Sequence, residues 1–429
     1  MNTNIMLPYG KEQLTIHIPQ EELKAVIESR LSLYDPQKSQ ETLIKEALEH
    51  PYDTPTLEEL AQNAEKVVII TSDHTRPMPS KLTMPLLLET IRQHNPKADI
   101  TILIATGCHR ATTRLEMIER FGSAIVNREN ILVHDCDKDA FTCVGISPDG
   151  NRIELNSLAC QADLLIAEGF IEPHFFAGFS GGRKSILPGI ASRSTIMYNH
   201  CARNINNPDS TMGSLNSNPI HQDMLFAAKA SGIRFILNVI LNDRKEVIGA
   251  VAGDIETAHR EGVNFLSSLC HSTTEPTDIV ITTNGGFPLD QNIYQSVKGM
   301  TTASSACREG GIIIIAARCN DGHGGHAFFQ TFAEESNTQK ILDGILSRNA
   351  SETIPDQWQS QIFCQILLKH TVILVSDAPR DMVEAMHLVY SHNMEDAMIT
   401  AKNILKKEHP SVTVIPDGVS VILSERGYC

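Results

Sequence analysis

The sequence predicts an α/β protein with two α/β domains and a ligand cleft between them. The chain has 429 residues, which is more than one domain usually contains. Short β-branched runs alternate with amphipathic stretches, the pattern of layered α/β proteins. A short polar segment with one proline, residues 271–277, interrupts this pattern. We therefore predict an N-terminal domain over residues 1–272 and a Rossmann-like C-terminal domain over residues 273–429.

Both predicted domains show strand and helix signals. In the first, helical spacing of apolar residues predicts helices over 80–94, with Ser80 as N-cap, 220–232 and 255–270. Strand-like runs cover 14–18, 66–72, 99–105, 130–134, 163–169 and 234–241, and a hairpin is predicted over 141–156. In the second predicted domain, apolar runs suit parallel strands that are buried on both faces, and helical segments lie between them. The predicted strands are 278–284, 311–317 and 371–377, and the predicted helices are 290–300 and 356–370.

The composition argues against several classes of partner. The chain has 36 Lys and Arg against 51 Asp and Glu, a net charge of -15, whereas binding to nucleic acid or anionic membranes needs a concentrated positive surface. The N-terminus lacks a signal peptide pattern, and the longest aliphatic run is too short to span a bilayer. Ten scattered cysteines without a C-x-x-C pair favour the reducing cytoplasm over a disulfide framework or a thiolate zinc site: Cys108, Cys136, Cys143, Cys160, Cys201, Cys270, Cys307, Cys319, Cys364 and Cys429.

Two familiar motifs match only in part. A Walker A loop counted from Gly178 has Arg183 in place of its second glycine, and a long side chain there would obstruct phosphate wrapping. Residues 321–327, DGHGGHA, match the dinucleotide fingerprint, but a helical pattern follows where a second strand should lie. We interpret this loop as a flexible rim with solvent- or ligand-facing histidines, because glycines preorganise a metal site poorly; its candidate ligands are Cys319, Asp321, His323 and His326.

Reactive side chains follow three predicted strands of the first domain. They occupy residues 73–76, 107–110 and 172–174, and a glycine-rich turn comes after the last group. Open α/β sheets bind ligands at the carboxyl ends of their strands. We therefore expect two imidazoles, a carboxylate and guanidinium groups to meet in one crevice.

Three further positions carry candidate chemistry. Partial desolvation beside Arg183 would lower the pKa of Lys184 and make its amine nucleophilic; the alternative is a phosphate-contacting or surface lysine. His200 has no carboxylate or thiolate at helical spacing, so a metal there would need donors from a bound molecule. Gln295 and Lys298 share one face of a helix, either toward a substrate carboxylate or toward solvent.

With these residues assembled, the chain resembles the nickel-dependent lactate racemase family over nearly its whole length. The motifs occur in the family's order and at similar spacing: DHTRP (73–77), GCHR (107–110), EPHFFAGFSGGRKSILPG (172–189), MYNH (197–200), YQSVKG (294–299) and Trp358. The resemblance implies nickel held in a pincer nucleotide, pyridinium-3,5-bisthiocarboxylic acid mononucleotide, attached to Lys184 as a thioamide. Its soft donors and one imidazole suit square-planar nickel. His200 would be the protein's nickel ligand, and Asp73, His74, Thr75 and Arg76 would contact the nucleotide.

The resemblance further implies an isomerase that interconverts D and L forms of a 2-hydroxy acid, with lactate as the leading substrate. His109 and His174 would be the two bases, one for each enantiomer. The Cα hydrogen would leave as hydride to the cofactor, because a Cα–H beside a carboxylate is barely acidic. Activity should fall as the histidines protonate, near pH 6.5 if they are unperturbed. The implied substrate contacts are Arg76, Tyr294, Gln295, Lys298 and Trp358.

The first domain would then bind the cofactor and carry the catalytic residues, and the second domain would contribute contacts to the substrate. The implied partners are the small 2-hydroxy acid and cofactor-maturation proteins. No motif fixes the substrate, so malate, a longer-chain hydroxy acid or an aldonate are alternatives with the same cofactor. A different class of function is a non-catalytic nucleotide or nickel carrier, or a phosphotransferase that uses the glycine turn.

Overall fold

The structure, a computed structural model, describes residues 2–425. Its contacts divide these residues into two compact units: unit 1 comprises 2–30, 201–206 and 270–425, and unit 2 comprises 31–200 and 207–269. Residues 2–30 were expected in the N-terminal domain, but they belong to unit 1. The reason is that a strand from this segment, β3 (Leu23–Val26), pairs in parallel with β19 (Val412–Ile415) of the unit 1 sheet. Cys429 lies outside the described residues.

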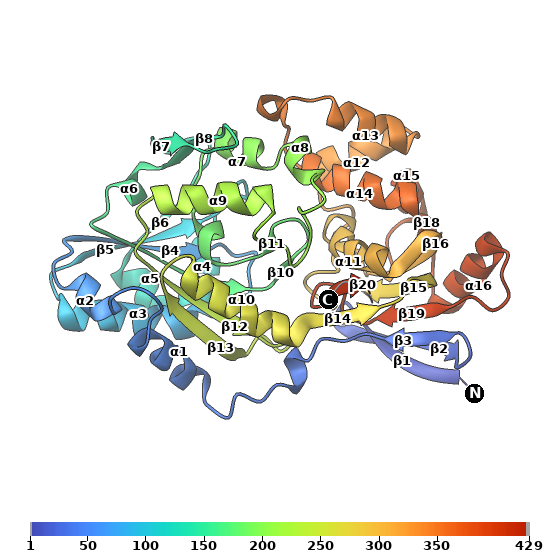
Figure 1. Cartoon of the computed structure of the whole chain (residues 1–429), viewed down its shortest axis with the longest axis horizontal. Helices are drawn as coiled ribbons and strands as arrows, with labels where there is room; N and C mark the ends of the chain where they lie inside the picture. Colours follow the sequence, from blue (N-terminus) through green and yellow to red (C-terminus); the bar gives the residue numbers. More distant parts are fainter. Residues whose placement is uncertain (1, 426–429) are drawn as a thin grey trace. The chain divides into compact units, whose positions relative to one another are not determined.

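Unit 2 is built on a six-stranded sheet in the order β13-β12-β9-β4-β5-β6 (Figure 1). All neighbours are parallel except β12 and β13. The strand order reverses between β4 and β9, the kind of place where open α/β sheets bind ligands. The strands are β4 (Lys66–Ser72), β5 (Asp99–Ala105), β6 (Asn130–Val133), β9 (Leu164–Ile171), β12 (Phe235–Leu241) and β13 (Val247–Gly253).

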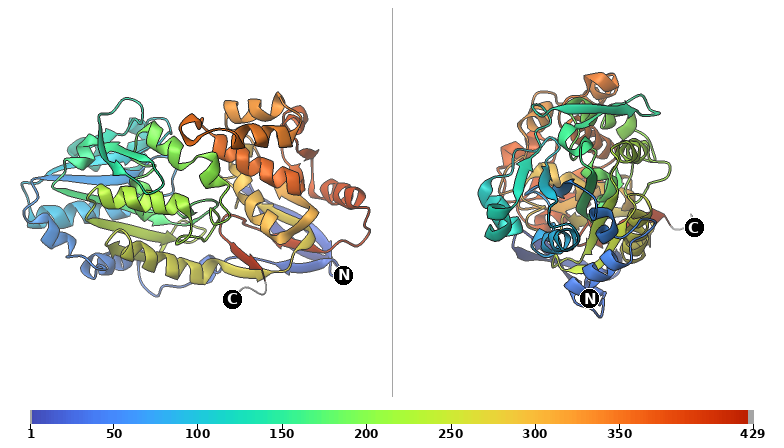
Figure 2. Two further views of the ribbon diagram at one scale, coloured as in Figure 1. Left: turned by 45° about the horizontal axis from the view of Figure 1, so that its top comes forward. Right: turned by 90° about the vertical axis from the view of Figure 1, so that its left-hand side faces the viewer.

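Helices cover both faces of this sheet (Figures 1 and 2). Apolar residues of α1 (Gln40–Glu49), α2 (Leu57–Ala61) and α3 (Ser80–His94) share one core with strand residues such as Phe170 and Val239. The alternate strand residues Ile171 and Ile240 lie instead against Gly262 of α10 (Thr257–Cys270). Because neighbouring side chains of a strand point to opposite faces, α10 covers the other side.

The start of α3 differs from the sequence prediction in one detail. The helix spans 80–94 as expected, but its N-cap is Pro79 and Ser80 is its first residue. The Ser80 hydroxyl donates to Glu168 Oε1 at 2.5 Å instead of capping the helix. A buried carboxylate therefore takes the hydroxyl that local sequence rules assign to a helix end.

The remaining elements of unit 2 surround the sheet, and they include the predicted hairpin, formed by β7 (Phe141–Ile146) and β8 (Arg152–Asn156). The others are α4 (Arg114–Phe121), α5 (Ser123–Arg128), α6 (Ser157–Cys160), β10 (Pro173–His174), β11 (Gly178–Phe179), η2 (Gly182–Ser185), α7 (Arg193–Asn199) and α9 (Pro219–Ala230).

Unit 1 contains a second six-stranded sheet, all parallel, in the order β18-β17-β16-β15-β19-β3. Its order reverses beside β15 (Thr277–Thr283). The expected buried parallel strands are therefore confirmed, as is the α/β class, whereas the Rossmann-like description stays a prediction. The other strands are β16 (Cys307–Ala316), β17 (Thr371–Val375) and β18 (Val389–Ser391).

Helices and two small sheets complete unit 1. The hairpin of β1 (Asn2–Tyr9) and β2 (Glu12–Pro19) contributes Ile5, Leu7, Ile16 and Ile18 to the core under the main sheet. The second small sheet pairs β14 (His271–Thr274) with β20 (Ile422–Glu425). The helices are α8 (Ala202–Ile205), α11 (Ile293–Ala306), α12 (His326–Ala333), α13 (Thr338–Leu346), α14 (Gln357–Lys369), α15 (Arg380–Ala385) and α16 (Met394–Leu405), with short 3-10 turns at Leu31–Leu33, in unit 2, and Ala350–Glu352.

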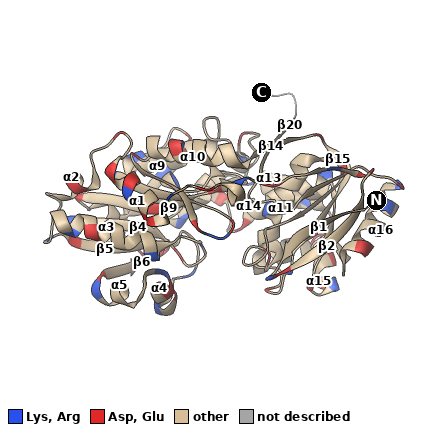
Figure 3. Ribbon diagram, turned by 90° about the horizontal axis from the view of Figure 1, so that it is seen from below, with Lys and Arg blue, Asp and Glu red and all other residues tan. Residues whose placement is uncertain are grey.

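Charged residues of both signs and free cysteines are distributed along the chain. Acidic and basic residues are interspersed along the ribbon (Figure 3). The nine cysteines between residues 2 and 425 carry no disulfide, and Cys108 Sγ lies 4.0 Å from Cys136 Sγ. Among the described helices, none combines the length and the apolar character that a bilayer crossing requires.

Candidate active site

Three loops gather at the carboxyl edge of the unit 2 sheet, beside the reversal of strand order. Residues 73–76 follow β4, residues 106–110 follow β5, and residues 172–189 follow β9. The backbone N–H of Gly107 donates to Gly189 O at 3.0 Å, which ties the second loop to the third. The three motifs predicted to share a crevice therefore do come from neighbouring strands.

Asp73 and His109 form a hydrogen-bonded pair at this edge. Asp73 Oδ2 lies 2.6 Å from His109 Nδ1, and the backbone and hydroxyl of Thr75 donate to Asp73 Oδ1. Burial raises the pKa of Asp73, but the hydrogen bonds from His109 and Thr75 and the nearby positive charges outweigh it and bring the pKa to about 2. An ionised Asp73 accepts the Nδ1 proton, so the neutral ring presents an unprotonated Nε2.

A half-buried arginine holds the turn that carries Asp73. The Arg120 guanidinium, from α4, donates to the backbone carbonyls of Asp73 and Arg76. Burial lowers the pKa of Arg120, and the negative charges of Glu168 and Asp73 oppose that shift. This contact fixes the position of the Asp73 backbone and therefore the direction in which its carboxylate points.

Glu168 is fully buried in β9 beneath the same turn. Its carboxylate accepts hydrogen bonds from the hydroxyls of Thr71, Ser80 and Thr83, at 2.6, 2.5 and 2.5 Å. Three donors and the charge of Arg120 compensate the loss of water around the carboxylate. Neither Arg120 nor Glu168 belongs to a recognisable local motif, so the sequence alone did not reveal their roles.

Lys184 lies in a tight turn that only glycines can form. Gly181 and Gly182 have φ angles of 76° and 51°. A Cβ on Gly181 would lie 2.7 Å from Asn238 Oδ1, and one on Gly182 would lie 2.9 Å from the His259 ring. Asn238 Oδ1 accepts the Gly182 N–H at 2.7 Å, so the turn is anchored on β12.

Arg183, next to Lys184, points into the protein. Its side chain is fully buried, and its guanidinium donates to the carbonyl oxygens of Ala177, Ser180 and Gly181. Burial lowers the pKa of Arg183 to about 9. Arg183, which breaks the Walker A pattern, thus stabilises the turn from inside the protein, a structural role that the sequence alone did not reveal.

The Lys184 amine lies in a cluster with His174, His200 and Phe176. Lys184 Nζ is 3.4 Å from His174 Nε2 and 5.7 Å from the centre of the Phe176 ring. The same Phe176 ring packs edge-on against the imidazoles of His174 and His200, at 4.6 and 5.2 Å between centroids. Three of the predicted functional residues therefore meet around one aromatic ring.

His200 has the features of a metal ligand. Its Nδ1 lies 3.1 Å from Ile196 O, so the neutral ring carries its proton there and Nε2 is the unprotonated nitrogen. Burial, and then the charge of Lys184, lower the pKa of His200 to about 3. Among residues 2–425, no group of three or more His, Cys, Asp or Glu could hold a metal. A metal at His200 would thus take its other donors from a bound molecule.

His174 lies between the Ala177 backbone and the Lys184 amine. The Ala177 N–H points at His174 Nδ1 at 3.3 Å, so a neutral ring carries its proton on Nε2. The Lys184 nitrogen lies 3.4 Å from this Nε2. A neutral amine is the nucleophilic form of lysine, which suits covalent attachment of a group.

Of the remaining residues predicted in unit 2, His74 Nδ1 lies 3.2 Å from Thr112 Oγ1, and burial lowers its pKa. Thr75 is exposed, and Arg76 is half-buried. In unit 1, His326 is exposed and the His323 ring stacks on Phe329 at 4.8 Å.

The residues predicted to contact substrate from the C-terminal half come together at α11 and α14. Asn284, directly after β15, donates to Gln295 O at 2.6 Å and accepts the Gly299 N–H at 2.9 Å, which sets the position of α11. Gln295 Oε1 is buried and has no hydrogen-bond partner among the described residues. The Tyr294 hydroxyl donates to Asp356 at 3.0 Å.

Trp358 belongs to the same neighbourhood. It lies in the first turn of α14, one residue before Gln359, whose amide donates to Tyr294 O at 2.5 Å. Tyr294 and Trp358 are thus held on neighbouring helices of unit 1. Asp356, two residues before Trp358, was not predicted, since an aspartate before a helix usually indicates only a cap.

Comparison with known proteins assigns the family. The lactate racemase N-terminal domain matches residues 9–213, and the lactate racemase C-terminal domain matches residues 272–423. A lactate racemase of Thermoanaerobacterium thermosaccharolyticum is 49% identical over 425 residues, 99% of this chain and 100% of the relative. This chain belongs to the lactate racemase family. It is therefore a racemase, an isomerase, and the resemblance seen in the sequence motifs is confirmed.

Two further comparisons agree with this assignment. A lactate racemase of Lactiplantibacillus plantarum is 45% identical over 421 residues, 98% of this chain and 99% of the relative. The lactate racemase apoprotein structure from T. thermosaccharolyticum superposes with a TM-score of 0.95, at 48% identity, covering 99% of this family member and 100% of that chain. A Thermotoga maritima protein at 20% identity shares the fold, with a TM-score of 0.64, 92% of this chain and 99% of that chain being covered.

Proposed function

We propose that this member of the lactate racemase family interconverts D- and L-lactate with a nickel pincer nucleotide tethered to Lys184. The observation that supports it most strongly is the cluster in which the Lys184 amine and two imidazoles gather around the Phe176 ring. The two imidazoles differ in their surroundings. His200 is buried with its Nδ1 bonded to a carbonyl, whereas His174 is half-exposed and faces the lysine nitrogen through Nε2.

The residues present fit the cofactor. Lys184 would provide the attachment nitrogen and His200 Nε2 the protein's nickel ligand, and the pKa of about 3 keeps His200 neutral, as a ligand must be. The pincer itself would supply soft donors, which suit square-planar nickel. When bound, the nucleotide supplies a reversible acceptor for the Cα hydrogen together with its electron pair. The loop of Asp73, His74, Thr75 and Arg76 is the proposed contact for the nucleotide.

The two histidines would manage the hydroxyl proton. His109 Nε2 accepts it from one enantiomer while Asp73 stabilises the imidazolium through Nδ1, and the proton returns to the oxygen when the 2-oxo acid is reduced. His174 is the proposed base for the other enantiomer. One base on each side removes the need for a single group to reach both faces of the substrate.

Residues of unit 1 would recognise the 2-hydroxy acid. Gln295 is a proposed contact of the 2-hydroxy acid, and its side-chain Oε1 is buried without a partner among the described residues. The Lys298 ammonium suits the carboxylate. Arg76 is a further proposed carboxylate contact, and Tyr294 and Trp358 are proposed walls of the substrate pocket.

The test uses holoenzyme made in a cytoplasm that also contains the cofactor-maturation proteins. Single enantiomers of lactate, malate, a longer-chain 2-hydroxy acid and an aldonate are supplied separately, and formation of the opposite enantiomer is followed by chiral chromatography. Turnover of lactate ahead of the others is expected. No turnover of lactate beside turnover of another acid would replace lactate with that acid.

The isotope test addresses the route of the Cα hydrogen. Lactate deuterated at Cα is racemised in ordinary water. We expect the product enantiomer to keep its deuterium, because the hydrogen is held on the enzyme and given back. Complete exchange with solvent would contradict hydride transfer and indicate proton abstraction. ATP binding that depends on Lys184, without any covalent adduct, would instead favour the carrier or phosphotransferase function.

A further inference from the structure

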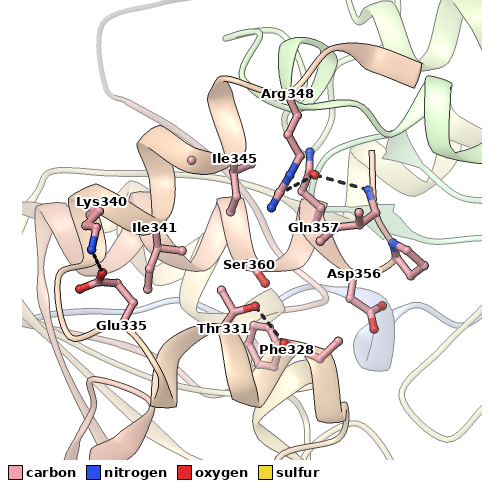
Figure 4. A pocket seen from close by; sticks show the side chains of 14 residues that line it. Phe328, Thr331, Glu335, Lys340, Ile341, Ile345, Arg348, Asp356, Gln357 and Ser360 are labelled. Atoms are coloured by element: carbon pink, nitrogen blue, oxygen red, sulfur yellow. Dashed lines mark hydrogen bonds and ion pairs between the residues drawn. The ribbon is translucent and has the colours of Figure 1, made fainter. Parts of the chain in front are cut away.

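We propose that unit 1 contains a second ligand site, a cavity between α12, α13 and α14 that binds a small monocarboxylate with an apolar side chain. The cavity has a volume of about 260 Å³ (Figure 4). An apolar cavity of about 150 Å³ can hold benzene, so this space accommodates a short acid. None of the proposed catalytic, cofactor or substrate residues lines it.

One end of the cavity presents donors suited to an oxyanion. The Arg348 guanidinium donates to Gln357 Oε1 at 3.0 Å, and the Ile354 N–H donates to the same oxygen at 3.4 Å. These two donors fix the orientation of the Gln357 amide, so its NH₂ group is turned the other way. Gln357 is only 3% exposed, and its Nε2 has no hydrogen-bond partner among residues 2–425.

A buried donor without a partner costs free energy unless a ligand satisfies it. Arg348 forms no ion pair with any described residue, so its charge is available as well. The Arg348 guanidinium, from a residue that lines the cavity, can donate to a carboxylate, and its contact with Gln357, another lining residue, holds it in place.

Much of the remaining wall is apolar. Ile341 and Ile345 of α13, both buried, and Phe328 of α12, fully buried, line the cavity. These side chains suit an alkyl or aryl group and not a second charge. The other cation at the cavity, Lys340, is already paired with Glu335. A monovalent acid therefore matches the site better than a phosphate ester, which would bring two charges to one guanidinium.

The site shares a residue with the environment of Tyr294. Asp356 lines the cavity, and its carboxylate accepts the Tyr294 hydroxyl at 3.0 Å. A ligand that fills the cavity would thus contact Asp356, whose carboxylate holds the Tyr294 side chain in place. The position of Asp356 offers a physical link from this cavity to the helix that carries Gln295 and Lys298.

The experiment measures binding of isocaproate to the full-length apoprotein by titration calorimetry. We expect saturable binding with a dissociation constant of about 1 mM, and about tenfold weaker binding of the neutral isocaproamide, since a charge-assisted hydrogen bond is lost. Arg348→Met should weaken isocaproate binding by about tenfold as well. Gln357→Leu, a variant of similar volume, should weaken it by a smaller factor. Circular dichroism and thermal unfolding verify that both variants are folded.

Two matched variants separate this site from others. Arg380→Met removes an exposed arginine that pairs with Glu384, and Lys298→Met removes the proposed lactate contact; both should leave isocaproate binding unchanged. The proposal would be overturned if the acid and the amide bound equally well, or if Arg348→Met bound isocaproate as tightly as the unmodified protein. It would also be overturned if Lys298→Met lost isocaproate binding while Arg348→Met kept it. The measurement needs no cofactor, so its result does not depend on whether lactate racemisation is confirmed.

Discussion

The two six-stranded sheets carry different kinds of side chain where their strand order reverses. In unit 2 the loops after β4, β5 and β9 carry Asp73, His109, His174 and Lys184, whose side chains can exchange protons or form covalent bonds. In unit 1 the reversal beside β15 is followed by Asn284 and by α11, which carries Gln295 and Lys298. Under the proposed function, unit 2 carries out the chemistry and unit 1 recognises the substrate. Four variant experiments test this division, from the largest expected effect to the smallest.

Lys184→Arg should abolish racemisation, by a factor of about 10⁴ or more, because a guanidinium retains the charge but is a poor nucleophile and forms no thioamide. Racemase activity and the intact mass of the protein are measured together. Lys229→Arg, an exposed lysine paired with Glu256, is the matched control and should be unaffected. Appreciable activity in Lys184→Arg would refute the attachment site.

Asp73→Asn should lower kcat by about 100-fold, because an amide no longer stabilises the His109 imidazolium. The double variant Asp73→Asn with His109→Ala should be no slower than His109→Ala alone, since the two residues act as a unit. Both single variants and His174→Ala should keep the adduct on Lys184. Losses that multiply in the double variant would show that Asp73 acts independently of His109.

Lys298→Met should mainly raise KM for lactate, by about tenfold to 100-fold, with a much smaller change in kcat. Initial rates over a range of lactate concentrations separate the two parameters. Lys369→Met, an exposed lysine at the end of α14, serves as control. If kcat collapses while KM stays constant, the division between chemistry and recognition fails.

The acid stability of the apoprotein tests the Asp73–His109 pair without any assay of activity. The pKa of Asp73 in the folded protein, about 2, is below its ordinary value of 3.8. Stability from this group is therefore complete above about pH 5 and is lost as the pH falls through 3.8 toward 2, a change of about 2 kcal/mol. Urea unfolding at several pH values should show a shallower acid loss in Asp73→Asn. Parallel curves for the two proteins would count against the pair.

Much of this organisation could be predicted from the sequence. The runs at 66–72 and 99–105 became β4 and β5 with the predicted boundaries, because β-branched residues buried on both faces leave little ambiguity. The functional positions could be named because they belong to contiguous motifs at strand ends. Their contacts in unit 2, such as Asp73 with His109, join motifs 36 residues apart and became visible only in the structure.

The features that were missed depend on distant pairing. Residues 2–30 look like an ordinary N-terminal segment, yet β3 joins a strand that lies almost 400 residues later in the chain. Ser80 obeys the local pattern of a cap, but a buried carboxylate 88 residues away takes its hydroxyl. Arg120 and Arg183 act through backbone carbonyls, which leave no pattern in the side-chain sequence.

Peptide mass spectrometry across Lys184, with nickel analysis of the same active holoenzyme, tests the central claim most directly. The account predicts a nucleotide-sized mass increase on the peptide that contains Lys184 and about one nickel per chain in racemising enzyme. Fully active enzyme with an unmodified lysine at this position and no bound nickel would contradict it.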